Sequence, residues 1–168
     1  MRLSILEHKR FFFQKQAGFS LIEVLAATAI LGVITALALP DFGKLFGTYQ
    51  LNCAAEEMAM HIRIQQENAM RYESPVYRVL FYEMGDSYSI ISDHRTMKYT
   101  TVKLQPSVRL AYHNFNRPGY NGLIFAANGN PIYRFGGHIA LQSRTTGAYR
   151  YIIINSIGRV RIDDKPPE

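Results

Sequence analysis

Hydrophobic and polar positions follow three successive patterns along the 168-residue chain. Residues 19–39 are almost all apolar, residues 47–72 carry apolar side chains at helical spacing, and residues 76–162 form short runs rich in Tyr, Val and Ile between turn residues. These patterns predict an apolar helix, then an amphipathic helix, then a series of β-strands.

The apolar segment predicts a membrane span. Its 21 residues, Phe19 to Leu39, contain one charged residue, Glu23, and a helix of this length rises about 31 Å, enough to cross the hydrocarbon core of a bilayer. By the positive-inside rule the N-terminus lies in the cytoplasm and the chain after Leu39 lies outside. The basic residues behind this orientation precede the segment: Arg2, Lys9, Arg10 and Lys15.

Two common roles of such a segment fit it poorly. A cleaved secretory signal peptide also places basic residues before an apolar core, but this core is too long, and the sequence ALPD at residues 38–41 contains no small-x-small cleavage site. An uncleaved anchor leaves Glu23 unexplained, because a charge at the bilayer centre costs roughly 2.5 to 3.5 kcal/mol.

The residues around Glu23 carry a family resemblance. The stretch GFSLIEV at residues 18–24, with its basic leader and apolar run, resembles the class III signal of type IV pilins and type II secretion pseudopilins. The resemblance implies that a prepilin peptidase removes the leader, residues 1–18, by cutting after Gly18, and methylates the new terminal amine on Phe19. It also implies that Glu23 pairs with the terminal amine of a neighbouring subunit when apolar helices pack in a filament, because a paired buried carboxylate costs less than an isolated one. The alternative is an unpaired Glu23 that reaches the lipid headgroups.

The second pattern predicts an amphipathic helix over residues 47–72. Its apolar stripe consists of Leu51, Ala55, Met58, Ile62 and Ala69. In pilin-like folds the span continues into such a helix, which supports a β-sheet, and residues 41–44 would be a loosened joint between the two halves. An independent helix after a short linker would give the same pattern. The resemblance implies an α+β, pilin-like fold with one globular domain, residues 40–168, whose length suits a single core.

The third pattern predicts a β-rich region over residues 76–162. Its expected strands cover residues 76–82, 88–92, 108–112, 123–126, 132–135, 138–142, 149–155 and 159–162. Short glycine-bearing links between them are typical of antiparallel strands. We expect a loop at residues 93–107 and a disordered tail at residues 163–168.

No motif in the chain predicts an enzyme. The single cysteine, Cys53, excludes an intramolecular disulfide; we expect it to pack, with a disulfide to another chain as the alternative. The histidines have neither metal-ligand nor triad spacing, and no nucleophile elbow, phosphate loop or paired-carboxylate motif is present. We therefore expect no catalytic residue, metal or cofactor.

The distribution of charge suggests a polyanion as a partner. The net charge is +6, and no Asp or Glu occurs between His94 and Ile162, where ten Lys and Arg residues lie. Such a field attracts nucleic acid, and the interleaved tyrosines could stack on bases. These tyrosines are Tyr112, Tyr120, Tyr133, Tyr149 and Tyr151. The alternatives are a solvated basic face or a docking surface for an acidic neighbouring pilin.

The last predicted strand is the most specific feature of this basic region. In the sequence GRVRI at residues 158–162, alternation puts Val160 and Ile162 on one face and both arginines on the other, about 7 Å apart. It resembles the Gly-Arg-x-Arg end of the GspH/FimT group of minor pilins and pseudopilins, some of which bind DNA during natural transformation. The resemblance implies DNA contacts at Arg159 and Arg161, and we expect the neighbouring basic residues Arg134, Arg144 and Arg150 to assist. Arginines on an edge strand can also serve only to prevent aggregation.

Taken together, the sequence predicts a minor pilin-like subunit of the cytoplasmic membrane with its globular domain outside. The expected partners are other pilins or pseudopilins, the prepilin peptidase, the inner-membrane assembly platform and DNA. In one interpretation the subunit captures DNA for uptake in competence. In the other it is a purely structural initiating or capping subunit of a type II secretion pseudopilus or type IV pilus. A lone membrane-anchored receptor, with the leader retained, is a third possibility.

Overall fold

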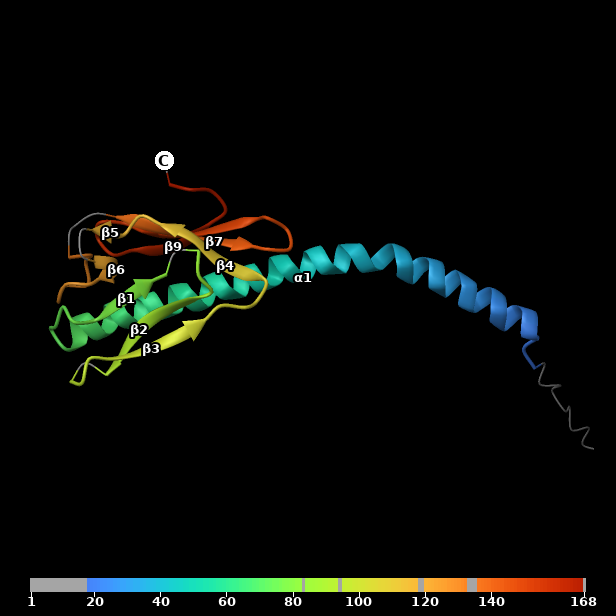
Figure 1. Ribbon diagram of the computed structural model, residues 1–168, viewed down its shortest axis with the longest axis horizontal. Helices are drawn as coiled ribbons and strands as arrows, with labels where there is room; N and C mark the ends of the chain where they lie inside the picture. The colour runs from blue at the N-terminus through green and yellow to red at the C-terminus, as the bar shows by residue number, and fades with distance from the viewer. Residues whose placement is uncertain (1–17, 83, 94, 118–119, 133–135, 168) are drawn as a thin grey trace, which may run out of the picture. The chain divides into compact units, whose positions relative to one another are not determined.

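The computed structural model describes residues 18–82, 84–93, 95–117, 120–132 and 136–167. In these residues one helix, α1 (Leu21–Arg71), is followed by nine strands (Figure 1). The strands are β1 (Arg78–Phe81), β2 (Ser87–Asp93), β3 (Lys98–Lys103), β4 (Val108–His113), β5 (Asn116–Arg117), β6 (Tyr120–Ile124), β7 (Gly137–Ser143), β8 (Tyr149–Ile154) and β9 (Val160–Asp163). The predicted leader lies outside the described residues, except for Gly18.

The strands form two antiparallel sheets, which lie against the C-terminal half of α1 (Figure 1). The larger sheet has the order β3-β2-β1-β6-β5 and the smaller has the order β4-β7-β8-β9. The two are tied together at the β1–β2 turn, where the carbonyl of Gly85 accepts a hydrogen bond from the N–H of Leu110 at 3.1 Å. This arrangement confirms the predicted α+β class.

The core lies between α1 and both sheets. The predicted stripe of α1 is fully buried: Leu51, Ala55, Met58, Ile62 and Ala69. It packs in one cluster with Phe81 of β1 and with Leu141 of β7 and Ile152 of β8. Burial of each large side chain stabilises the domain by about 1.5 to 3 kcal/mol. Cys53, expected to pack, is exposed instead.

The chain divides into two units between Leu39 and Pro40. In the first unit every described side chain from Gly18 to Leu37 is exposed, although most of them are apolar. Among the described residues, no single helix has the length and hydropathy of a membrane span; the segments Leu21–Leu37 and Phe42–Arg71, joined through a bend, qualify together by length and composition. An apolar surface of this kind needs lipid or other protein around it.

Most of the predicted strands are present, with boundaries shifted by a few residues. The loop prediction at residues 93–107 is wrong, because β3 lies there. Five of its six side chains are exposed and only Val102 packs partly against the core, so β3 lacks the alternation that marks a half-buried strand. Strand β5 was also not predicted, and β6 begins earlier than the predicted segment 123–126. Of the strand predicted at residues 132–135, only Ile132 is described, and it lies in a turn. Strand β9 extends to Asp163, the first residue of the predicted tail.

Candidate functional site

The N-terminus of α1 is closed by a reciprocal pair of hydrogen bonds. The N–H of Ser20 donates to Oε2 of Glu23 at 3.0 Å, and the N–H of Glu23 donates to Oγ of Ser20 at 3.2 Å. This is a capping box, which satisfies two backbone donors that a helix start otherwise leaves unpaired. Sequence reasoning missed it, although Ser-x-x-Glu before an apolar run is its signature. The box holds Glu23 next to Phe19, whose side chain is 87% exposed.

Strand β9 has the alternation predicted for it. Val160 and Ile162 pack against the core, whereas Arg161 is exposed on the opposite face of the strand. Arg159, just before the strand, is also exposed, and its guanidinium has no hydrogen-bond or ion-pair partner among the described residues. The structure therefore brings these two arginines together at one edge of the smaller sheet.

The β8–β9 turn that carries Arg159 is fixed by α1. Nε2 of Gln66 donates to the carbonyls of Gly129 and Gly158, at 2.7 and 3.0 Å. Gly158 has φ +80°, and a Cβ at this position would lie 2.4 Å from Nε2 of Gln66, so only glycine fits without a shift. Oδ1 of Asn155 accepts the N–H of Arg159 at 2.7 Å and holds the turn from the other side.

Arg161 has an acidic partner. Its Nη1 lies 3.1 Å from Oδ2 of Asp163, and both side chains are partly exposed. The backbone N–H groups of Lys165 and Asp164 lower the pKa of Asp163, with the charge of Arg161 contributing less. The carboxylate thus stays ionised at neutral pH and reduces the field of Arg161.

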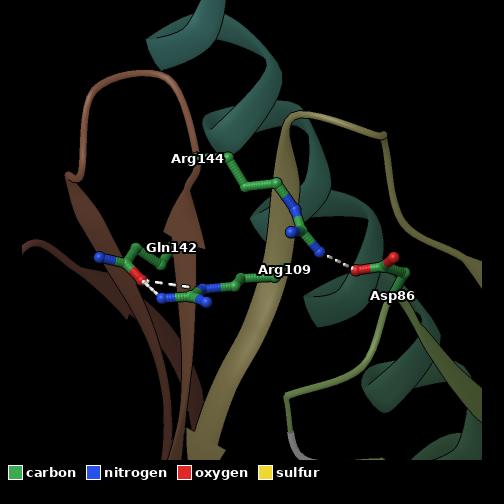
Figure 2. Close-up of polar contacts among 4 residues, drawn as sticks. All are labelled: Asp86, Arg109, Gln142 and Arg144. Atoms are coloured by element: carbon green, nitrogen blue, oxygen red, sulfur yellow. Dashed lines mark hydrogen bonds and ion pairs between the residues drawn. The ribbon is translucent and has the colours of Figure 1, made fainter.

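At the other end of strand β8, Arg144 is paired as well. Figure 2 shows its guanidinium on the carboxylate of Asp86, a residue of the β1–β2 turn. In the same view Arg109 donates from Nε and Nη2 to Oε1 of Gln142, at 3.0 and 2.7 Å. Arg109, Gln142 and Arg144 line a shallow hollow of about 280 Å³ together with Ser143 and Gly147.

Arg150 points in the opposite direction from Arg161. Its Nε donates to Oδ1 of Asn52 on α1 at 2.8 Å, so it lies on the helix side of the sheet. Asn52 and Gln66 are 14 residues apart on α1, which places the contacts of Arg150 and of the Gly158 turn about 21 Å apart along the helix. The predicted basic residues therefore do not form one patch, and Arg134 lies outside the described residues.

No group of three or more His, Cys, Asp or Glu side chains among the described residues could hold a metal ion. The side chains that the structure assembles at the two ends of β8 are arginines and amides. Their chemistry is that of binding to anions.

The comparisons with known proteins find one N-terminal motif and one fold that this chain shares with pilin-like proteins. The prokaryotic N-terminal methylation motif matches residues 13–39. Two crystal structures of the type IV minor pilin FimU of Pseudomonas aeruginosa strain PAO1 are similar to this chain, with TM-scores of 0.55 and 0.53 and identities of 17% and 18%. The first similarity covers 72% of this chain and 95% of the FimU chain, and the second covers 70% and 98%. No curated protein matches the sequence.

At these identities the likeness to FimU shows the fold alone. The motif adds a prepilin-type N-terminal signal, and the motif and fold together support a minor pilin or pseudopilin that is membrane-anchored or associated with a pilus. Proteins of this class associate with other pilins and are processed by a prepilin peptidase. A pilin is a structural protein, and the class fits a protein without enzymatic activity.

Proposed function

We propose that the chain is a minor pilin-like subunit that joins a filament through its N-terminal helix. The peptidase would cut after Gly18 and methylate Phe19, and residues 19–39 would span the inner membrane, with the globular domain outside, until the assembly platform extracts them. Support comes from the methylation motif and from the apolar side chains exposed on every side of this segment.

We propose that Glu23 directs this assembly. In the capping box Oε2 of Glu23 accepts the N–H of Ser20, and Oε1 accepts no hydrogen bond among the described residues, which leaves it for the terminal amine of a neighbour. Glu23→Val is expected to give a processed, membrane-inserted subunit that fails to enter filaments. Co-purification with sheared filaments measures this, and incorporation at the parental level would overturn the role.

We further propose that the domain binds DNA through Arg159 and Arg161. The observation that carries this proposal is the β8–β9 turn: Gln66 and Asn155 bond its backbone and leave the guanidinium of Arg159 exposed. Along an extended strand the two arginines are about 7 Å apart, close to the separation of adjacent phosphates on one strand. The hydrogen bonds of Gln66 and Asn155 fix the backbone of the turn, which lowers the cost of ordering it on binding, and the exposed guanidinium of Arg159 is available for a phosphate.

Fluorescence anisotropy of the full chain in neutral detergent micelles, against labelled duplex DNA over a salt series, tests this proposal. Arg159→Ala with Arg161→Ala should abolish most of the affinity. The plot of the logarithm of the binding constant against the logarithm of the salt concentration should also become less steep, by the amount expected for the loss of about two phosphate contacts. Arg144→Ala with Arg150→Ala is the matched control, because it removes the same charge at the other end of β8 and should retain most of the affinity. Equal losses in the two double variants would overturn the assignment.

A second candidate is a purely structural subunit that initiates or caps a pseudopilus. Of the arginines predicted to contact DNA, three are already bound within the subunit: Arg144 to Asp86, Arg150 to Asn52 and Arg161 to Asp163. In this case the basic residues stabilise the domain and fit a neighbouring pilin. An absence of DNA binding at low salt, together with a partner pilin whose binding requires Arg159, would favour it.

A further inference from the structure

The face of the smaller sheet directed away from α1 carries a connected set of aromatic and basic side chains. The strand register puts three rows on this outer face: Arg109, Gln142 and Tyr149; then Tyr112, Ala140, Tyr151 and Asp163; then His138, Ile153 and Arg161. Residues of the opposite parity, such as Leu110, Leu141 and Ile152, pack in the core with α1. Three outer residues, Ala140, Tyr151 and Ile153, form a separate small cluster.

Four rings on the outer face form a continuous chain. Tyr112 and His138 meet edge to face with centroids 5.7 Å apart, and His138 meets Tyr151 in the same way at 5.9 Å. Tyr151 then stacks on Tyr149, with centroids 6.0 Å apart and planes 16° from parallel. Burial and a hydrogen bond with Tyr112 raise the pKa of Tyr151 to about 12, which favours the neutral phenol within this chain of rings. Tyr112 is 41% exposed and Tyr149 is half-buried, so these two rings offer surfaces to a ligand.

Positive charge lies on both sides of this ring chain. On β4, Arg109 is oriented by the neutral amide of Gln142, which leaves its charge intact. On the β9 side lie Arg161 and the unpaired Arg159, and among the described residues the one acidic side chain on this face is Asp163. Three strand spacings of about 4.8 Å put the two basic edges about 14 Å apart.

We propose that the outer face binds single-stranded nucleic acid, with bases stacked on Tyr112 and Tyr149 and phosphates held by Arg109, Arg159 and Arg161. A single strand presents both phosphates and free base faces, and positive charge around stacked aromatic rings is the arrangement that binds it. A duplex keeps its bases stacked inside, so the tyrosines add little to its affinity. The inference rests on the proposed DNA binding and specifies which form of nucleic acid the outer face prefers.

The test uses the full chain in neutral detergent micelles and three labelled probes. These are an oligothymidylate of about 12 nucleotides, within the site sizes of known single-strand binders, an abasic deoxyribose-phosphate strand of equal length, and a duplex. We expect the oligothymidylate to bind roughly tenfold more tightly than the abasic strand, because stacking acts only on the former. The chain contains no tryptophan, so quenching of tyrosine fluorescence gives an independent signal of stacking.

Matched variants distinguish a loss of base stacking from a loss of the folded structure. Tyr112→Leu with Tyr149→Leu keeps apolar volume but removes both rings, and should abolish the preference for oligothymidylate while duplex binding remains. Tyr112→Phe with Tyr149→Phe keeps the rings and should keep the preference. Tyr99→Leu on β3, where the tyrosine is 38% exposed, is the control for loss of a strand tyrosine from the other sheet.

Equal affinity of the parent chain for the thymidylate and abasic strands would overturn the inference. So would an unchanged preference in the double leucine variant. If duplex binding that depends on Arg159 and Arg161 persists in either case, the proposed function stands without the stacking face. A failure of all three probes to bind would overturn both the stacking inference and the proposed DNA binding.

Discussion

The β7–β8 turn and the β8–β9 turn lie at opposite ends of strand β8, and each combines an exposed arginine with a glycine of positive φ. Arg144 and Gly147 (φ +71°) belong to the first, and Gly158 (φ +80°) and Arg159 to the second. Both turns rest on α1. The first lies close to Gly47, where a Cβ would be 3.1 Å from Cβ of Thr145, and the second is bonded by Gln66.

The turns differ in what the rest of the domain does with the arginine. At the first turn the side chain itself is engaged, since Arg144 pairs with Asp86. At the second turn α1 engages only backbone groups: Gln66 bonds the Gly158 carbonyl, and Nη2 of Arg63 bonds the Val160 carbonyl at 3.3 Å. A basic sequence therefore becomes a basic surface only where the fold holds the backbone and leaves the side chain to solvent.

The largest expected effect comes from the two glycines. At Gly158 an added Cβ would lie 2.4 Å from both Nε2 of Gln66 and the Gly129 carbonyl oxygen, whereas at Gly147 it would meet nothing within 4 Å. Gly158→Ala should lower the free energy of unfolding by about 3 kcal/mol, from steric conflict added to backbone strain. Gly147→Ala should lower it by about 1 kcal/mol, from backbone strain alone. Thermal unfolding followed by near-UV circular dichroism measures both, and equal losses would contradict the comparison.

The next largest effect is a difference in stability between variants of two α1 glutamines, Gln66 and Gln50, each of which forms hydrogen bonds at one end of the smaller sheet. Gln66→Leu leaves the carbonyls of Gly129 and Gly158 without their donor and should cost about 2 kcal/mol of unfolding free energy. Gln50→Leu removes one hydrogen bond, from the hydroxyl of Ser107, and should cost about 1 kcal/mol. If DNA binds at the β8–β9 turn, only Gln66→Leu should also weaken duplex binding in the anisotropy assay. A loss of binding in both variants would show that the effect is general instability.

The same comparison shows which parts of the fold could be predicted from the periodicity of the sequence. The α1 stripe and the alternation of Val160, Arg161 and Ile162 were predicted, because period and burial are directly related in half-buried elements. Strand β3 was not, because five of its six side chains are exposed and only Val102 is partly buried. The early start of β6 was missed for another reason: Gly122 carries no side-chain signal, yet a Cβ there would lie 2.3 Å from the carbonyl oxygen of Val79.

The candidate site was predicted only in part. Local spacing correctly put Arg161 on the exposed face of its strand, but pairing across the chain was not readable. Asp86 lies 58 residues from Arg144, outside the acid-free stretch that suggested a basic face. For Arg150 a signal was available: it stands between Tyr149 and Tyr151, so the period of two puts it on the other face from both tyrosines.

Removing one acid at each end tests the role of charge pairing. Asp163→Asn frees Arg161 and should raise duplex affinity about two- to fivefold at low salt, with a smaller gain at high salt, because both side chains are exposed and screened. Asp86→Asn frees Arg144 and should change affinity by less than about twofold if the second turn is the contact. A larger gain in duplex affinity in Asp86→Asn would indicate that DNA binds at the β7–β8 turn instead. Anisotropy at two salt concentrations distinguishes these results.

The smallest expected effect is a shift in the titration of Asp163. Its Oδ1 accepts the N–H groups of Asp164 at 2.9 Å and Lys165 at 3.4 Å, and these backbone bonds lower its pKa more than Arg161 does. A folded-state pKa below the unfolded value means that this carboxylate stabilises the fold above its unfolded pKa, and that the contribution is lost as pH falls through the folded pKa.

An NMR titration of the Asp163 carboxyl should therefore give an inflection below the ordinary aspartate value. Lys165→Pro removes the backbone N–H of Lys165 and should raise the pKa of Asp163 more than Arg161→Gln does. Lys165→Ala is the control for the loss of the lysine charge. The reverse order would mean that the ion pair with Arg161, and not the backbone bonding, lowers the pKa of Asp163 the most. In either order the lowered pKa keeps Asp163 ionised beside Arg161 throughout the neutral range, which makes the unpaired Arg159 the stronger phosphate contact of the two.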